Sequence, residues 1–463
     1  MGRLSRQIHK ITFDKRMSKI LDFFKGQSRS ATVKKNAAGS LLIKGFSIVF
    51  SLMLIPLTIS YVSSEVYGIW LTLSSIIIWF GILDAGFSLG LKNKLANMLA
   101  LNRMEEARAY ISTTYATMVA IFIPVCIIML FVVNAIDWTT LLNIAPQYGD
   151  DVVRALYAIV LCFCIQMVLG VINAVLAANQ MVAVTSLIYF IGNATSLVTI
   201  FVLTLVAPPS LFVLSVCQAC IPVIVFFIAS IFLFITKLKH QRPSFKLISK
   251  KHVANLFDLG YKFFILQIQV LVVGQTTNFL VSYVSGPIDV TSYNIAYRYI
   301  GIAFMSFLII TEPLWPAFTD AFAKKDFRWM NNTYKNMSKV RIAFEVFIII
   351  LILMAPLVYH IWIGDKTIIP MSMTIAVGIY FMAQLWMSLN ITLINGIGCI
   401  QLQTYLAIFV SVVHIPLSVI LGNCIGAIGV VVSLIVLNLL YAIVSQIQIR
   451  KVLSSTATGI WTK

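Results

Sequence analysis

The chain has 463 residues, of which 60% are hydrophobic and 11% are charged. Soluble domains average about 25% charged residues, so this composition excludes an ordinary soluble protein and indicates a polytopic membrane protein. The net charge of +18 would also suit a nucleic-acid-binding protein, but it is spread over several short segments and is not gathered in one basic domain. We therefore expect no nucleic-acid partner.

Twelve predominantly apolar segments are long enough to cross a bilayer, which takes about 20 residues. The predicted spans are residues 37–60, 66–91, 109–133, 153–178, 182–206, 211–236, 257–282, 290–318, 341–361, 369–396, 403–421 and 427–449. The sequence thus predicts an all-α membrane protein. Because the number of spans is even, both termini lie on the same side of the membrane.

The basic residues indicate which side that is. Of the 34 Lys and Arg, 29 lie in five clusters outside the apolar parts of the spans: residues 1–36, 92–108, 237–252, 321–341 and 450–463. Lys and Arg are retained on the cytoplasmic side of short loops, so each cluster marks the cytoplasm. We predict a basic N-terminal tail, a basic linker and a C-terminal tail, all cytoplasmic.

The linker at residues 237–252 separates two sets of six predicted spans, residues 37–236 and 253–449, and the two halves look related. Polar residues recur at seven-residue steps in the first span of each half: Lys44, Ser51 and Thr58, and Lys262, Gln269 and Thr276. Seven residues are close to two helical turns, so each set lies on one helix face. Both spans end in Ser-Tyr-Val-Ser, at residues 60–63 and 282–285.

A duplicated unit in which both halves keep the same orientation has its pseudo-two-fold axis along the membrane normal. We therefore expect two six-helix bundles that enclose a central cavity. The many Asn and Gln residues within the spans either bond helix to helix or line a hydrated cavity that accepts sugar hydroxyls. The polar residues that we expect to line this cavity are Asn294, Thr291, Gln269, Thr276 and Ser51.

Ionisable side chains in hydrocarbon cost roughly 2.5–3.5 kcal/mol each, so they need partners or a hydrated cavity. Lys44 and Asp84 both lie about seven residues, or ~10 Å, from the cytoplasmic ends of consecutive spans. Lys262 and Glu312 occupy matching depths in the other half. Two interpretations stay open. In the first, each lysine pairs with the carboxylate at its depth or extends to the nearby membrane surface, and the residues only stabilise the spans. In the second, the pairs form a cytoplasmic gate in which Asp84 and Glu312 could also take up H⁺ or Na⁺.

Arg298 differs from the other cations because no acidic residue lies at its depth in any predicted span. It lies about eight residues, or ~12 Å, below the outer end of its span. At 100° per residue it shares a face with Thr291, Asn294 and Met305. Either Arg298 snorkels outward, or it lines the cavity and binds an anion, for which its planar guanidinium is suited.

Three further groups carry weaker signals. His414 lies two residues before Pro416 and either relays protons or is satisfied by a helix carbonyl. Glu345 follows Arg341 by one turn, which predicts a local ion pair. The seven cysteines lie in apolar surroundings without His or acidic neighbours, so we expect no metal site.

The second predicted span and the loop after it carry a motif. Tyr67-Gly68-Ile69-Trp70 is followed by Leu-Asp-Ala-Gly-Phe-Ser-Leu-Gly at residues 83–90 and by the basic Lys92-Asn93-Lys94. This motif resembles the second-helix signature of bacterial polysaccharide exporters. These are the O-antigen-type flippases of the multidrug/oligosaccharidyl-lipid/polysaccharide superfamily, relatives of the MATE exporters. The division into two halves of six predicted spans each also matches this family, so the resemblance extends over nearly the whole chain.

The resemblance implies a V-shaped pair of bundles in the bacterial inner membrane. It implies that the protein moves an undecaprenyl-diphosphate-linked oligosaccharide from the inner to the outer leaflet by alternating access. Arg298, with Lys44 and Lys262, would supply positive potential for the diphosphate. The sequence has no G-x-x-x-x-G-K-[ST] motif for a nucleotide. We expect a non-enzymatic, monomeric transporter without a cofactor, driven either by an H⁺ or Na⁺ gradient or by use of the glycan on the far side. Its other expected partners are membrane lipids and polysaccharide-assembly proteins.

Three alternatives remain. A MATE-type drug/cation antiporter should have cavity carboxylates without basic partners. A membrane glycan polymerase or ligase usually needs a sizeable outer loop, and the longest one here is residues 134–152. A flippase for the lipid-linked peptidoglycan precursor would need two more helices.

Overall fold

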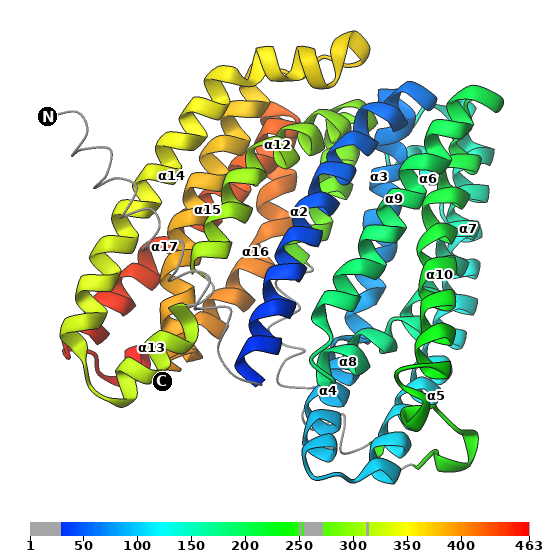
Figure 1. Ribbon diagram of the computed structural model, residues 1–463. Helices are drawn as coiled ribbons and strands as arrows, with labels where there is room; N and C mark the ends of the chain where they lie inside the picture. Colours follow the sequence, from blue (N-terminus) through cyan, green and yellow to red (C-terminus); the bar gives the residue numbers. More distant parts are fainter. Residues whose placement is uncertain (1–28, 250–251, 254–271, 312–313, 463) are drawn as a thin grey trace, which may run out of the picture.

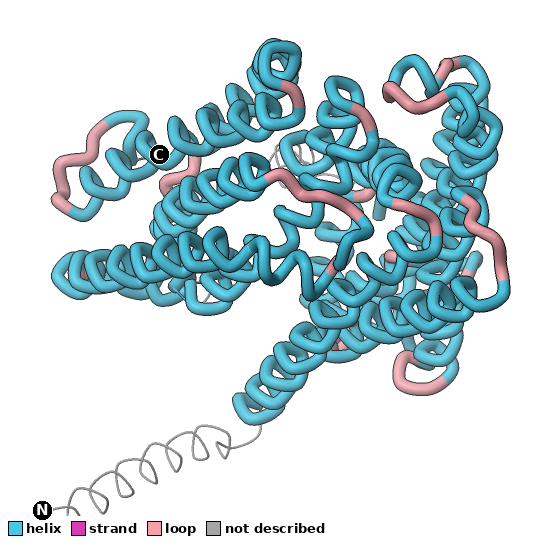
Figure 2. The backbone as a smooth tube through the Cα atoms, turned by 90° about the horizontal axis from the view of Figure 1, so that it is seen from above, coloured by secondary structure: helices cyan, strands magenta, loops and turns pink. Residues whose placement is uncertain are grey.

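The computed structural model describes residues 29–249, 252–253, 272–311 and 314–462, and all regular structure in these ranges is helical (Figure 2). The α-helices are α2 (Arg29–Tyr61), α3 (Ser64–Ile78), α4 (Ala85–Ala100), α5 (Met104–Ala135), α6 (Trp138–Leu141), α7 (Gly149–Leu169), α8 (Val171–Ala178), α9 (Val182–Val206), α10 (Leu211–Ile235), a helix at residues 272–285, α12 (Pro287–Thr311), α13 (Leu314–Ala323), α14 (Phe327–Trp362), α15 (Met371–Ile397), α16 (Gln401–Ile425) and α17 (Ala427–Leu453). The 3₁₀ turns are η1 (Trp79–Leu83), η2 (Pro146–Tyr148), η3 (Lys239–Gln241), η4 (Phe245–Leu247), η5 (Gly364–Lys366) and η6 (Gly459–Thr462).

Within these ranges, ten helical segments are long and apolar enough to cross a membrane, and Gly45–Tyr61 is a shorter apolar helix. The prediction of an all-α polytopic membrane protein is confirmed. Most of the seventh predicted span, residues 257–282, lies outside the described residues.

The helices form two bundles, which lie side by side in Figures 1 and 2. In the first bundle α2 packs along α9, and α7 packs against both α5 and α10. In the second bundle α15 packs against α12, α14 and α17, and α17 also packs against α16. The main contact between the bundles is that of α3 with α12.

Two of the predicted spans that the structure describes in full are not single helices. The span predicted at residues 66–91 consists of α3, the 3₁₀ turn η1 and α4. A tighter turn of this kind inside a span often marks a hinge. The span predicted at residues 153–178 is divided into α7 and α8 at Gly170.

The basic linker is docked on the first bundle. The Arg108 side chain donates to the carbonyl of Arg242 at 3.1 Å, and the amide of Ser244 donates to the Ser112 hydroxyl at 2.8 Å. Asn179 and Gln241 exchange two side-chain hydrogen bonds of 2.9 Å. We call the end of the molecule that carries this linker and the α4–α5 loop the basic end, and the other end the opposite end.

Candidate functional site

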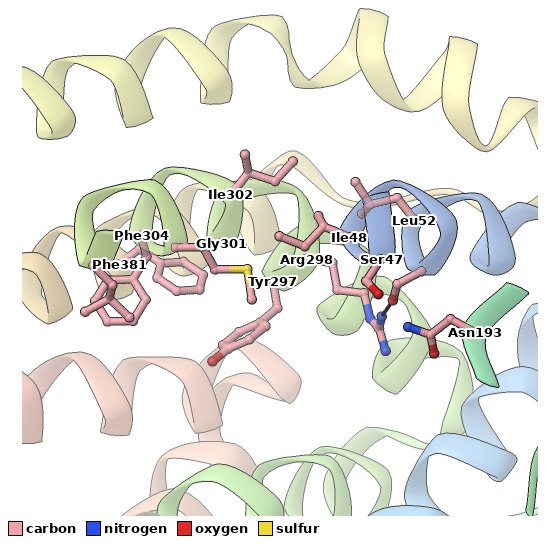
Figure 3. Close-up of a pocket in the computed structure, with 13 residues that line it drawn as sticks. Ser47, Ile48, Leu52, Asn193, Tyr297, Arg298, Gly301, Ile302, Phe304 and Phe381 are labelled. Atoms are coloured by element: carbon pink, nitrogen blue, oxygen red, sulfur yellow. Dashed lines mark hydrogen bonds between the residues drawn. The ribbon is translucent and has the colours of Figure 1, made fainter. Parts of the chain in front are cut away.

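A cavity of about 450 Å³ lies between the bundles. The first bundle contributes Ser47, Ser51 and neighbouring apolar residues of α2, and Asn193 of α9. The second bundle contributes Tyr297, Arg298 and further residues of α12, together with Phe381 of α15 (Figure 3). A relative movement of the two bundles would therefore change the shape of this cavity.

Arg298 is the one charged residue among the described residues that line this cavity. It is the twelfth residue of α12, counting from Pro287, and its Nη1 donates to Ser51 Oγ at 2.7 Å. Figure 3 shows the guanidinium between α2 and the side chain of Asn193. None of the ion pairs within the described residues includes Arg298. A guanidinium has five N–H donors, and the bond to Ser51 is the one that Arg298 makes within the described residues, so further donors can bind an anion in the cavity.

The other end of the cavity is apolar and aromatic. The ring of Phe381 lies 4.8 Å from that of Tyr297 and 5.8 Å from that of Phe304, measured between centroids. Gly301 leaves room for Phe381, because a Cβ at this glycine would lie 3.2 Å from the ring. The cavity thus offers a cation at one end and an apolar surface at the other, which suits an amphipathic anion.

The bundles meet at the opposite end, along a contact of α3 with α12 that we call the seam. A Cβ at Gly68 of α3 would lie 1.8 Å from the carbonyl oxygen of Pro287 on α12, so only glycine permits this approach. Beside it, Thr291 Oγ1 donates to the carbonyl of Ser64 at 2.6 Å. Gly68 belongs to the Tyr-Gly-Ile-Trp motif, and its role in the seam was not evident from the sequence.

Other hydrogen bonds near the seam also join the two bundles. Lys366 Nζ donates to the Ser60 hydroxyl, and Trp362 Nε1 donates to the carbonyl of Leu52 at 3.0 Å. Ser282 Oγ donates to the carbonyl of Leu142 at 2.8 Å. The opposite end is therefore closed by several independent contacts.

Two residues predicted to line the cavity lie at the contact between the bundles instead. Thr291 is fully buried in the seam. Asn294 donates to Asn278 Oδ1 at 2.8 Å, and Asn278 in turn donates to Ser75 Oγ of α3 at 2.7 Å. Both residues face α3, whereas Arg298 and Met305, which were predicted on the same face of the helix, line the cavity.

Asp84 occupies the N-cap position of α4 without a side-chain hydrogen bond to the backbone there, and its carboxylate accepts a hydrogen bond from Ser88 Oγ at 2.7 Å. Thr276 lies in the wall of a separate, almost wholly apolar cavity of about 680 Å³. His414 is fully buried within α16, where its Nδ1 lies 3.3 Å from Ser418 Oγ.

The predicted pair of Arg341 and Glu345 is confirmed. Lys262, Gln269 and Glu312, and the side chain of Lys44, lie outside the part of the chain that the structure describes. The two predicted Lys–carboxylate pairs therefore stay predictions.

No sequence family and no curated protein match the chain. Solved structures do match. One of them, the inward-facing conformation of a multidrug resistance MATE family transporter of the MOP superfamily, gives a TM-score of 0.76 at 14% identity and covers 90% of this chain and 98% of that one. The chain has the MATE fold. The likeness establishes the fold and not the substrate.

Two further MATE structures match less well. An outward-facing conformation of a multidrug resistance MATE family transporter gives a TM-score of 0.61 at 14% identity and covers 92% of this chain and 96% of that one. MATE in the straight conformation gives 0.59 at 15% identity with the same coverage.

Proposed function

We propose that this MATE-fold protein is a flippase for an undecaprenyl-diphosphate-linked oligosaccharide in the bacterial inner membrane. The observation that carries the proposal is Arg298, a cation without a carboxylate partner among the described residues, which lines the cavity between the bundles. An arginine fork binds phosphate oxygens in bidentate geometry and stays charged at any relevant pH.

The rest of the cavity fits the same substrate class. Low-dielectric walls concentrate the potential of a single cation, which attracts the diphosphate. The aromatic surface of Tyr297, Phe304 and Phe381 suits the apolar faces of sugar rings or the start of the lipid chain. Ser47, Ser51 and Asn193 offer hydrogen bonds to hydroxyl groups.

The closed seam supports a direction of transport. Clusters of Lys and Arg place the basic end in the cytoplasm. With the opposite end closed, the substrate enters from the cytoplasmic leaflet. The seam then opens and the basic end closes, so that the glycan is released on the outer side by alternating access, driven by an H⁺ or Na⁺ gradient.

The second candidate is a drug/cation antiporter, because several of the matching solved structures are described as multidrug resistance transporters. The charge of the cavity favours the flippase. Its described lining contains an arginine and no carboxylate, and an arginine repels a cationic drug.

Substitution of Arg298 tests the proposal. We expect Arg298→Ala to lower export of the surface glycan about 10- to 100-fold, since a hydrogen bond to a charged group contributes roughly 1.5–3 kcal/mol. We expect Arg298→Lys to retain part of it. Export is measured as glycan on the cell surface, together with lipid-linked oligosaccharide that accumulates in the inner leaflet.

The matched control is Arg154→Ala, which removes an exposed arginine from the first turns of α7. This variant should export normally. If Arg298→Ala cells display unchanged glycan at equal amounts of folded protein, Arg298 does not bind the substrate. A strain from which the gene is deleted distinguishes the two candidates. If it accumulates no lipid-linked oligosaccharide but becomes sensitive to cationic drugs, the protein is the antiporter.

A further inference from the structure

A second polar cavity, of about 790 Å³, lies at the basic end within the second bundle. It is bounded by the first turns of α14, the later part of α15 and the last turns of α17. It shares no lining residue with the cavity that contains Arg298. The proposed flippase reaction therefore makes no use of it.

The lining of this cavity is strongly basic. Lys335, Lys339 and Arg341 come from α14, and Arg450 comes from α17. Among the ion pairs in the described part of the chain, only that of Arg341 with Glu345 involves one of these four cations. Three cations thus line one cavity without a carboxylate partner among the described residues, and their combined positive potential would attract an anion.

The polar wall is fixed before any ligand binds. Asn390, which is fully buried, donates to the carbonyl of Ala442 at 3.3 Å and lies 3.2 Å from the Tyr334 hydroxyl that donates to it. The guanidinium of Arg341 lies over the ring of Trp386, 5.6 Å from its centroid. An anion would therefore meet a hydrogen-bonded wall and exposed lysines at the rim.

The surroundings of the cavity point to a lipid. On the side of the cavity toward the membrane core, α14 exposes Ile342 (51%) and Val346 (50%), and α17 exposes Ile443 (47%). Free phosphate would gain nothing from these side chains, whereas acyl chains below a headgroup would cover them. Basic pockets between transmembrane helices on the cytoplasmic side bind phosphate headgroups in this way.

We propose that this cavity binds the phosphate headgroup of an anionic phospholipid of the cytoplasmic leaflet, with the acyl chains along the exposed faces of α14 and α17. The proposal does not depend on the transported substrate. A bound lipid would bridge α14 and α17, and would therefore stabilise the second bundle at its basic end.

Trp386 provides a local probe. In purified protein, brominated phosphatidylglycerol bound in this cavity should quench the fluorescence of Trp386. The quenched component should be absent from the Trp386→Phe variant. Brominated phosphatidylcholine, which has no net charge, should not quench it. The triple variant Lys335→Ala/Lys339→Ala/Arg450→Ala should need on the order of 100-fold more brominated phosphatidylglycerol for the same quenching. Each cation near the membrane surface contributes about 1 kcal/mol, which is about a fivefold change in affinity.

The matched control is Lys237→Ala/Lys239→Ala/Lys246→Ala, which removes three exposed lysines from the linker of the first bundle and should leave quenching unchanged. The proposal would be overturned if both brominated lipids quenched equally. It would also be overturned if the two triple variants lost quenching by phosphatidylglycerol to the same extent. Inorganic diphosphate is added as a competitor. If it displaces the lipid at equal concentration, the site holds a free phosphate and the lipid assignment is wrong.

Discussion

At the residue scale, Gly68 and Arg298 define the two parts of the proposed mechanism. Arg298 supplies the charge in the cavity, and Gly68 allows the bundles to approach closely at the seam. The two helices that carry them, α3 and α12, form the main contact between the bundles. Binding and closure are thus built on the same pair of helices.

We expect Gly68→Ala to hold the seam open. The added Cβ would lie 1.8 Å from the carbonyl oxygen of Pro287 and 2.9 Å from Thr291 Oγ1, and a backbone carbonyl cannot move aside without moving α12. Opening can be measured with a cysteine at Ser282, which is fully buried in the unchanged protein. A membrane-impermeant thiol reagent should label Ser282→Cys faster when Gly68→Ala is also present, and glycan export should fall.

Gly192→Ala is the control, because Gly192 also lies inside a helix but has nothing within 4 Å of a Cβ. This change should be neutral or should stabilise the protein by about 0.5–1 kcal/mol, the usual difference between glycine and alanine in a helix. If Gly68→Ala and Gly192→Ala behave alike in labelling and export, the close approach of α3 and α12 is not required for transport.

At the element scale, length and apolar composition predicted the spans well, because a bilayer sets the length of a helix. They could not predict where along a helix the two bundles touch. Ser51 and Arg298, both expected in the cavity, line it and are joined by a hydrogen bond. Thr291 was expected on the same face of α12 but lies about two turns nearer the opposite end, in the seam, where Gly68 allows α3 to approach α12 closely.

The junction of η1 and α4 places Asp84 at a helix start, where a carboxylate is favoured by the helix dipole. We predict that Asp84→Asn gives folded protein whose transport no longer depends on an H⁺ or Na⁺ gradient, because the amide can still accept the hydrogen bond from Ser88 but cannot carry the charge. Transport into proteoliposomes with imposed gradients measures this dependence.

Ser88→Ala distinguishes the effect of the Asp84 charge from that of its hydrogen bond with Ser88. It removes the donor to the Asp84 carboxylate and should lower stability by roughly 1 kcal/mol while the ion dependence remains. If transport by Asp84→Asn depends on the imposed gradient as much as transport by the unchanged protein does, a group other than Asp84 couples transport to the ion.

At the scale of the whole molecule, the hydrogen bonds across the opposite end cannot all persist if the bundles separate there. Lys366 of the second bundle donates to Ser60, near the end of α2 in the first. Both residues are exposed, so cysteines at these positions would be open to a reagent from the outer side. A covalent link between them tests whether the opposite end opens at all.

We predict that a short reducible thiol cross-linker stops transport by Ser60→Cys/Lys366→Cys and that reduction restores it, because the link holds the opposite end closed. The control Asn179→Cys/Gln241→Cys places the same link between two residues of the first bundle that already exchange hydrogen bonds. It should transport normally when linked. The unchanged protein, with its seven native cysteines, receives the same treatment. Full transport by the linked Ser60–Lys366 variant would mean that the substrate crosses without separation of the bundles, and alternating access would be the wrong description.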